Sequence, residues 1–102
     1  MSEKQPALRL DKWLWHARFF KTRALSAEMV AAGKVRVNTA RVRKPATPVR
    51  IGDGLTIVQG RDIRTVRVTG LGERRGPATE ARMLYDDLAP RDTVGERDDG
   101  SA

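Results

Sequence analysis

The sequence predicts one small α+β domain, in which two N-terminal helices pack on a small antiparallel sheet and one short helix follows at the C-terminal end. Three observations support this prediction. Apolar residues first recur at helical spacing, then alternate with polar residues as they do in strands, and glycines and prolines separate these segments. A chain of 102 residues is long enough for a single domain with a modest core.

The first helix is predicted over residues 9–20, where apolar side chains recur at i, i+3, i+4 and i+7. This spacing places them on one face of an α-helix, which is the face that packs into the core. The residues on that face are Leu10, Trp13, Leu14, Ala17 and Phe20. Trp13 and Phe20 are therefore expected to be core residues.

Two further aromatic residues of this helix, Trp15 and Phe19, do not share the apolar face. At about 100° per residue they lie on the opposite side, flanking Lys12 and near His16. They could make a second hydrophobic contact with the C-terminal helix or the strands, or form a platform on which unpaired bases stack. The first interpretation is favoured, because large aromatic side chains in small soluble proteins usually find intramolecular contacts. His16 is expected to be a partly exposed and incidental member of a basic patch.

The second helix is predicted from Arg23 to Ala32, with Thr22 as its N-terminal cap and Gly33 at its end. The residues expected on its inward side are Leu25, Met29 and Ala32. Strands are predicted next, because "KVRVN" (34–38) and "ARVRK" (40–44) alternate basic and apolar residues around a turn at Asn38.

Two prolines then mark an irregular connection to a further strand pair, "VRIGDGLTIV" (49–58) and "TVRVTG" (65–70). The last predicted element is a short helix from Pro77, a residue suited to a first helical turn, to about Leu88. Its inward residues would be Ala81, Leu84, Tyr85 and Leu88. Residues 89–102 contain four acids, two arginines and one branched apolar residue, so this tail is expected to be disordered.

The charge of the chain favours a polyanionic partner. Lysine and arginine number 20 against 13 acids, which gives a net charge of +7, and residues 9–50 hold eleven of the cations with only two acids. Such an excess favours nucleic acid or an anionic membrane over an acidic small molecule. The chain has no cysteine and therefore neither disulfides nor a cysteine-ligated zinc. No signal peptide or membrane span is recognisable, so a cytoplasmic protein without a membrane or cofactor role is expected.

Two basic segments are candidates for contact with phosphates. At "KTRA" the free N–H groups of a helix start lie between two cations, which suits either a phosphate site or an ordinary threonine cap with solvated neighbours. In the first strand pair, the side chains of Lys34, Arg36, Arg41 and Arg43 are expected on one solvent face. Two elements of the same charge with few acids between them repel each other, and this repulsion favours an anionic partner.

The motifs "RLDKWL", "KTRAL", "GKVRVN" and "GDGLTI", in this order and spacing, resemble the S-four domain, the RNA-binding module named after the fourth protein of the small ribosomal subunit. The resemblance covers about residues 9–58. The Trp-Leu-Trp segment, the run from Phe19 to Leu25 and "RRGPATEARMLYDDL" further resemble the small ribosome-associated heat-shock proteins of bacteria. Where that family often has Asn-Gly, this chain has Asn38-Thr39, and His16 replaces a small or basic residue.

The resemblance implies an αL-type RNA-binding module without catalytic activity, a partner in ribosomal RNA on the large subunit that carries a stalled nascent chain on tRNA, and a monomer off the ribosome. It also implies a structural role for Asp11. Domain bounds follow as an N-terminal arm (1–8), the S-four-type domain (9–58), a strand and helix extension packed on it (59–88) and the tail (89–102). The residues expected to contact RNA, with the two hairpin arginines included for their charge, are Arg9, Lys12, Arg18, Lys21, Thr22, Arg23, Lys34, Arg36, Asn38, Arg41 and Arg43.

Other functions compete with this interpretation. An enzyme is disfavoured, because the chain has one histidine, no cysteine and no phosphate-loop glycine motif. An adaptor that binds protein through Trp15 and Phe19, and a nonspecific DNA binder, both remain alternatives. A filter-binding comparison of duplex DNA, duplex RNA and ribosomal subunits would distinguish a ribosomal-RNA binder from a DNA binder and from a protein-binding adaptor.

Overall fold

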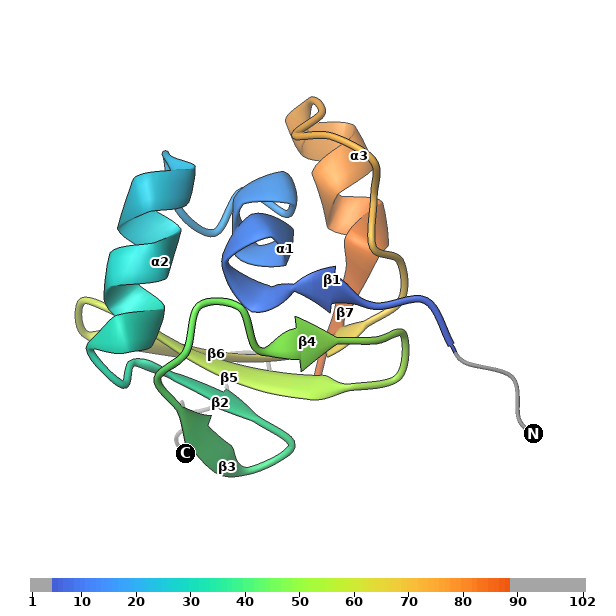
Figure 1. The fold of residues 1–102 in the computed structure, drawn as a ribbon. Helices are drawn as coiled ribbons and strands as arrows, with labels where there is room; N and C mark the ends of the chain where they lie inside the picture. Colours follow the sequence, from blue (N-terminus) through green and yellow to red (C-terminus); the bar gives the residue numbers. More distant parts are fainter. Residues whose placement is uncertain (1–4, 89–102) are drawn as a thin grey trace, which may run out of the picture.

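The computed structural model describes residues 5–88 and has two layers, with all helices on one side of a five-stranded sheet (Figure 1). The helical elements are α1 (Leu10–His16), α2 (Arg23–Ala31), α3 (Ala78–Ala81) and the 3₁₀ turn η1 (Arg82–Leu84). The strands are β1 (Leu8–Arg9), β2 (Val35–Val37), β3 (Ala40–Val42), β4 (Pro48–Val49), β5 (Gly54–Gln59), β6 (Asp62–Val68) and β7 (Tyr85–Asp87). This architecture confirms the predicted α+β class.

The main sheet is antiparallel and has the strand order β3-β2-β5-β6-β7, while β1 and β4 form a separate two-stranded ribbon. Alternate residues of the main sheet face the helices and are buried, in keeping with the period of two in a strand. This buried face contains Val35, Leu55, Ile57, Val66 and Val68. In the described part of the chain no helix covers the opposite face, which Figure 1 shows as the open side of the sheet.

The apolar face predicted for the first helix is confirmed, since Leu10, Trp13 and Leu14 are fully buried. The helix itself is shorter than predicted and ends at His16. Arg18 then adopts a left-handed conformation with φ of 64°, which reverses the chain direction. Because the helical periodicity stops there, Phe19 does not lie opposite Trp13 and turns back into the core.

Phe19 confirms the favoured interpretation of an intramolecular contact. Its ring centroid lies 5.9 Å from that of Trp13 and 4.9 Å from that of Tyr85, and the Arg64 guanidinium lies 5.2 Å from the Phe19 centroid. Partial burial lowers the pKa of Arg64, but hydrogen bonds and charge interactions with Asp87 and Tyr85 outweigh this effect and raise it. Arg64 therefore stays charged and covers the aromatic cluster from one side.

The second helix begins as predicted, because the Thr22 hydroxyl accepts a hydrogen bond from the backbone N–H of Leu25 at 3.0 Å. Gly33 follows its end with φ of 78°, a conformation that favours glycine. The predicted inward side is confirmed in part, because Leu25 and Met29 are half-buried and pack against the core. Ser26 and Val30 are fully buried on the same helix, whereas Ala32, the C-terminal cap residue, is exposed.

The hairpin between β2 and β3 turns at two residues with positive φ, Asn38 at 50° and Thr39 at 77°. Asn38 is held by its side chain, which accepts from Gly54 N at 2.8 Å and donates to Asp53 Oδ1 at 3.1 Å. The β-branched Thr39 has no such bond and lies in a region that costs roughly 1–2 kcal/mol for a residue with a Cβ. The turn is therefore of the tight kind in which two left-handed residues match the twist of the strands.

Thr39→Gly should raise the free energy of unfolding by about 0.5–1 kcal/mol, because relief of the left-handed strain exceeds the entropy cost of glycine in the unfolded chain. Urea unfolding monitored by tryptophan fluorescence measures this change. The matched variant Asn38→Gly removes the bonds to Gly54 and Asp53 and should not stabilise the protein. A Thr39→Gly protein no more stable than the parent would show that the turn relaxes without strain.

The C-terminal helix predicted from Pro77 to about Leu88 is wrong in its second half. Only one α-helical turn forms, the 3₁₀ turn η1 follows, and Tyr85 is extended with φ of −155° and ψ of 160°. β7 instead pairs with the edge of β6, whose backbone groups form hydrogen bonds with it. A short helix ending in two aspartates would be less stable, because aspartate is a poor helix former. Ala81 is buried and Leu84 and Tyr85 are half-buried as expected, whereas Leu88 is exposed.

Three side chains from the first helical segment bind backbone carbonyls of residues 70–76. Trp13 Nε1 donates to Gly70 O at 2.8 Å, His16 Nδ1 lies 3.2 Å from Leu71 O, and Arg18 Nε donates to Gly76 O at 2.7 Å. The expectation of a partly exposed His16 is wrong, since only 1% of its surface is accessible. The predicted tail at 89–102 and the first four residues of the predicted arm lie outside the described residues.

Candidate nucleic-acid interface

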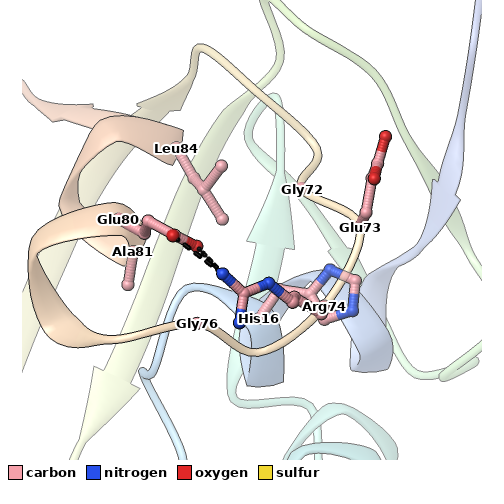
Figure 2. A pocket seen from close by; sticks show the side chains of 8 residues that line it. All are labelled: His16, Gly72, Glu73, Arg74, Gly76, Glu80, Ala81 and Leu84. Atoms are coloured by element: carbon pink, nitrogen blue, oxygen red, sulfur yellow. Dashed lines mark hydrogen bonds and ion pairs between the residues drawn. The ribbon is translucent and has the colours of Figure 1, made fainter.

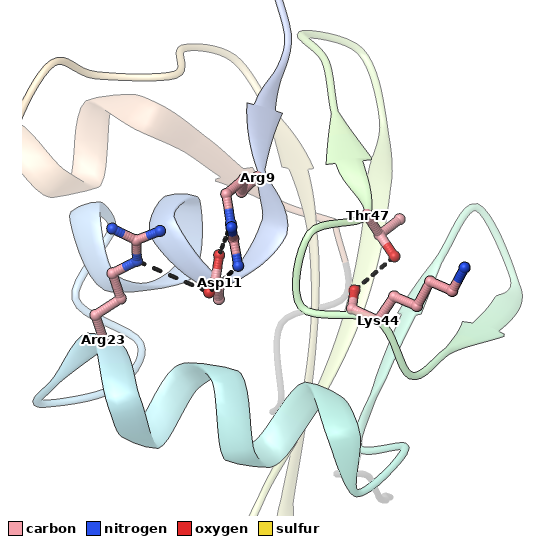
Figure 3. Close-up of polar contacts among 5 residues, drawn as sticks. All are labelled: Arg9, Asp11, Arg23, Lys44 and Thr47. Atoms are coloured by element: carbon pink, nitrogen blue, oxygen red, sulfur yellow. Dashed lines mark hydrogen bonds and ion pairs between the residues drawn. The ribbon is translucent and has the colours of Figure 1, made fainter.

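The buried carboxylate of Asp11 brings two of the predicted site residues together (Figure 3). Arg9 donates from Nε and Nη2 to the two Asp11 oxygens at 3.0 and 3.1 Å, and Arg23 Nε lies 3.8 Å from Asp11 Oδ2. The Asp11 side chain is 4% exposed, whereas those of Arg9 and Arg23 are 50% and 43% exposed. This confirms the expected structural role of Asp11, which fixes two partly exposed cations beside the starts of α1 and α2.

The start of α1 is closed by the chain between β3 and β4. Leu10 N donates to Thr47 O at 2.8 Å and Asp11 N donates to Pro45 O at 3.1 Å, so these amides are not available to a ligand. The same connection exposes Lys44, whose carbonyl accepts from the Thr47 hydroxyl at 2.6 Å. Lys44 was not among the expected contact residues, although the local excess of cations included it.

The start of α2 is more accessible. Lys21, Thr22 and Arg23 are all exposed, and the first amides of a helix have no partner within it. Thr22 satisfies the amide of Leu25, so the cap itself is confirmed. We call the group of Arg9, Lys12, Lys21, Thr22 and Arg23 the helix junction. Within it Lys12 is half-buried and the others are exposed.

A second basic group lies on the β2–β3 hairpin. Arg36 and Arg41 are directly opposite each other in the register, so two like charges share one side of the sheet. Arg41 and Arg43 pass over the end of α2, where a Cβ on Gly33 would lie 3.4 Å from Arg41 Cδ and 3.2 Å from Arg43 Cζ. With Lys34 these side chains are exposed, as the alternation predicted. Apart from Arg18, the expected contact residues thus divide between the helix junction and this hairpin.

Two of the expected contact residues, although exposed, form hydrogen bonds within the protein. Asn38 bonds Gly54 and Asp53, and Arg18 bonds Gly76 O, so both contribute to the fold whatever else they bind. Of the two aromatic residues considered for base stacking, Phe19 is buried. Trp15 is half-buried, with its ring centroid 5.7 Å from that of His16. Only Trp15 keeps an accessible surface for stacking.

Residues 5–88 contain no group of three or more His, Asp or Glu side chains that could hold a metal ion. Within the same range, no helix is both long and apolar enough to cross a membrane.

Two helices on an antiparallel sheet, with cations gathered at the helix junction and the adjoining hairpin, define a small basic domain of the nucleic-acid-binding class. The family model of the S4 domain matches residues 8–55. The chain belongs to the S4-domain family of heat shock protein 15. It is 53% identical to heat shock protein 15 of Escherichia coli K12 over 91 residues, which are 87% of this chain and 67% of that relative.

Further relatives agree with this assignment. The chain is 39% identical to the RQC P-site tRNA stabilizing factor of Halalkalibacterium halodurans, over 78% of this chain and 88% of that protein. The solved structure of the trimeric heat shock protein 15 of Vibrio cholerae matches with a TM-score of 0.77 and 45% identity, over 82% of this chain and 84% of that chain.

Proposed function

We propose that this protein binds structured ribosomal RNA on the large ribosomal subunit and has no catalytic activity. The observation that carries the proposal is the helix junction, where a buried carboxylate holds two exposed arginines next to the start of a helix. The S4-domain match and the names of the relatives support RNA as the ligand and the ribosome as its location. The cytoplasm follows as the proposed compartment.

The junction can bind a phosphate by three means at once. The amides at the start of α2 donate hydrogen bonds, the helix dipole favours negative charge there, and Lys21 and Arg23 supply cations. Asp11 holds Arg9 and Arg23 in place, so less side-chain entropy is lost when RNA binds. Because the duplex form of RNA is recognised mainly through its backbone, such a site suits structured RNA.

A finer proposal concerns tRNA. Relatives named for stabilising a P-site tRNA share 37–39% identity with this chain, and heat shock protein 15 shares 53%. We therefore propose that the target is a large subunit that still carries a nascent chain on tRNA, in ribosome recycling or quality control. A monomer off the ribosome remains our proposal for the free protein, and sedimentation equilibrium would measure it against the trimer named for the Vibrio cholerae relative.

Binding to ribosomal RNA should depend steeply on salt. If about four to six of the expected basic residues neutralise phosphates, the logarithm of affinity should fall with the logarithm of salt concentration at a slope of roughly −3 to −5. Titrations of a ribosomal RNA fragment between low and physiological salt measure this slope. A flat dependence would count against RNA as the partner and would favour the adaptor alternative.

Removal of residues 89–102 should leave RNA affinity unchanged or raise it slightly. That segment carries four acids and two arginines, so its removal makes the remaining protein more positive. Parallel titrations of the full chain and a chain ending at Leu88 test this expectation. A large loss of affinity would mean that the removed segment contributes contacts of its own.

A further inference from the structure

A cavity of about 170 Å³ lies between the end of α1 and the C-terminal segment (Figure 2). None of its lining residues belongs to the helix junction. His16 forms one wall, and Glu80, Ala81 and Leu84 form the side that α3 and η1 contribute. The rim consists of Gly72, Glu73, Arg74 and Gly76. A closed apolar cavity of about 150 Å³ is known to hold one benzene ring. This cavity is partly open, so it has room for one flat heterocycle with its substituent left outside.

The size of the cavity depends on glycines at its rim. Gly72 has φ of 75°, and a Cβ there would lie 3.1 Å from Leu84 Cδ1 and 3.4 Å from His16 Nδ1. A Cβ on Gly76 would collide with the carboxylate of Glu80. His16 is 1% exposed and is held through Nδ1 by Leu71 O, while its buried Nε2 has no partner in the described residues. The wall that this ring forms is therefore fixed.

The polar groups of the cavity are an acceptor and a donor side by side. Arg74 Nη2 donates to Glu80 Oε1 at 3.1 Å and to Oε2 at 2.9 Å, and both residues are drawn at the cavity in Figure 2. The two side chains are 65% and 51% exposed, so water screens the pair and a ligand can replace it at low cost. A carboxylate so placed repels phosphate and accepts hydrogen bonds from a base edge.

We propose that this cavity binds one unstacked guanine base of the RNA partner. Guanine presents two adjacent donors, N1–H and N2–H, which match the two oxygens of Glu80. Its O6 acceptor lies next to them and matches the guanidinium of Arg74. Ala81 and Leu84 supply an apolar surface for the ring, opposite the fixed His16. That the guanine belongs to RNA rests on the proposed function, whereas the preference for guanine over other bases rests on the groups that line the cavity.

Arg18 places a cation at the same rim. Its Nε is bonded to Gly76 O at 2.7 Å, and the exposed guanidinium retains further N–H groups for the phosphate of the bound nucleotide. Arg18 has a left-handed backbone conformation and lies where the first helical segment meets the C-terminal segment. The proposed phosphate contact gives this residue a role in addition to reversing the chain. Figure 1 shows α1 between α2 and α3, so the base would enter from the side of α1 that faces away from α2.

The test is an NMR titration of the full chain with GMP, AMP, CMP and inorganic phosphate, observing backbone amides. We expect GMP to shift saturably the amides of Gly72, Gly76 and residues 80–84, with a dissociation constant about tenfold lower than that of AMP or CMP. Glu80→Gln should weaken GMP binding about tenfold, because its amide N–H₂ opposes the donors of guanine. The matched variant Glu28→Gln, which removes the same charge from an exposed position on α2 outside the cavity, should leave it within about twofold.

Shifts that phosphate alone reproduces, no saturable shifts with GMP, or equal losses in Glu80→Gln and Glu28→Gln would each overturn the proposal. Thermal melts of both variants show whether they remain folded. Binding of ribosomal RNA by the parent, measured separately, distinguishes the two proposals. RNA binding without a GMP site refutes only the guanine site, and a GMP site without RNA binding refutes only the proposed function.

Discussion

Trp13→Ala should lower the free energy of unfolding by about 3–5 kcal/mol, enough to leave a domain of this size largely unfolded near body temperature. The Trp13 side chain is fully buried, stacks on Phe19 and lies edge-on to Tyr85 at a centroid distance of 6.4 Å. Its Nε1 also donates to Gly70 O. The substitution therefore leaves a cavity where three segments meet and an unpaired carbonyl within it.

Urea unfolding followed by circular dichroism measures this loss. Trp13→Phe retains most of the volume and should lose clearly less, which keeps the comparison measurable if the alanine variant does not fold. Trp15→Ala is the matched control two positions away, and because Trp15 is only half-buried its loss should be smaller than that of Trp13→Ala. Equal losses at positions 13 and 15 would contradict the described core.

The double variant Lys21→Ala/Arg23→Ala should weaken ribosomal RNA binding by roughly 1–3 kcal/mol and make the salt slope shallower by up to about two. Both side chains are exposed at the start of α2, so the loss falls on the RNA contact. The melting temperature should change little, because Asp11 keeps both hydrogen bonds from Arg9 when Arg23 is removed. Paired thermal melts and titrations at two salt concentrations measure both effects.

The control is Arg61→Ala/Arg82→Ala, which removes the same charge from exposed positions outside the expected contact set. This control should reduce RNA affinity only because it lowers the overall positive charge of the protein, and the reduction should be smaller than that of the junction variant. If the junction variant binds like the parent, the start of α2 is only a helix cap. The RNA surface would then have to lie on the hairpin side, at Lys34, Arg36, Arg41 and Arg43.

Local patterns predicted the parts of the fold that depend on local interactions. The burial of Leu10, Trp13 and Leu14 follows from helical spacing, and the Thr22 cap and the Gly33 stop follow from the hydrogen bonding and conformational freedom of those residues. The exposed alternation of the hairpin follows from the period of a strand.

The errors lie where distant segments decide the outcome. Phe19 is buried because the chain reverses at Arg18, and helical geometry cannot be extended past that point. His16 is buried because residues 70–84, far along the chain, cover it. Residues 85–87 form a strand because the edge of β6 offers partners, a tertiary effect that outweighs the helix-like spacing of Ala81, Leu84 and Tyr85.

For the same reason, the sequence predicted the role of some residues of the candidate site and missed that of others. Asp11 and its two arginines lie close in sequence or on adjoining helices, and their association confirms the structural role inferred for Asp11. Arg18 and Asn38 carry bonds to residues 76 and 53–54, which no local pattern reveals. Lys44 lies on the connection between β3 and β4, and hydrogen bonds from this connection to the start of α1 determine its path.

Cosedimentation with separated ribosomal subunits, with and without a peptidyl-tRNA trapped on the large subunit, tests the central claim most directly. The proposed function predicts that the protein sediments with the large subunit at physiological salt, more completely when the peptidyl-tRNA is present, and that Lys21→Ala/Arg23→Ala reduces this fraction. Sedimentation with both subunits alike, or a protein that stays in the supernatant with every subunit, would contradict it.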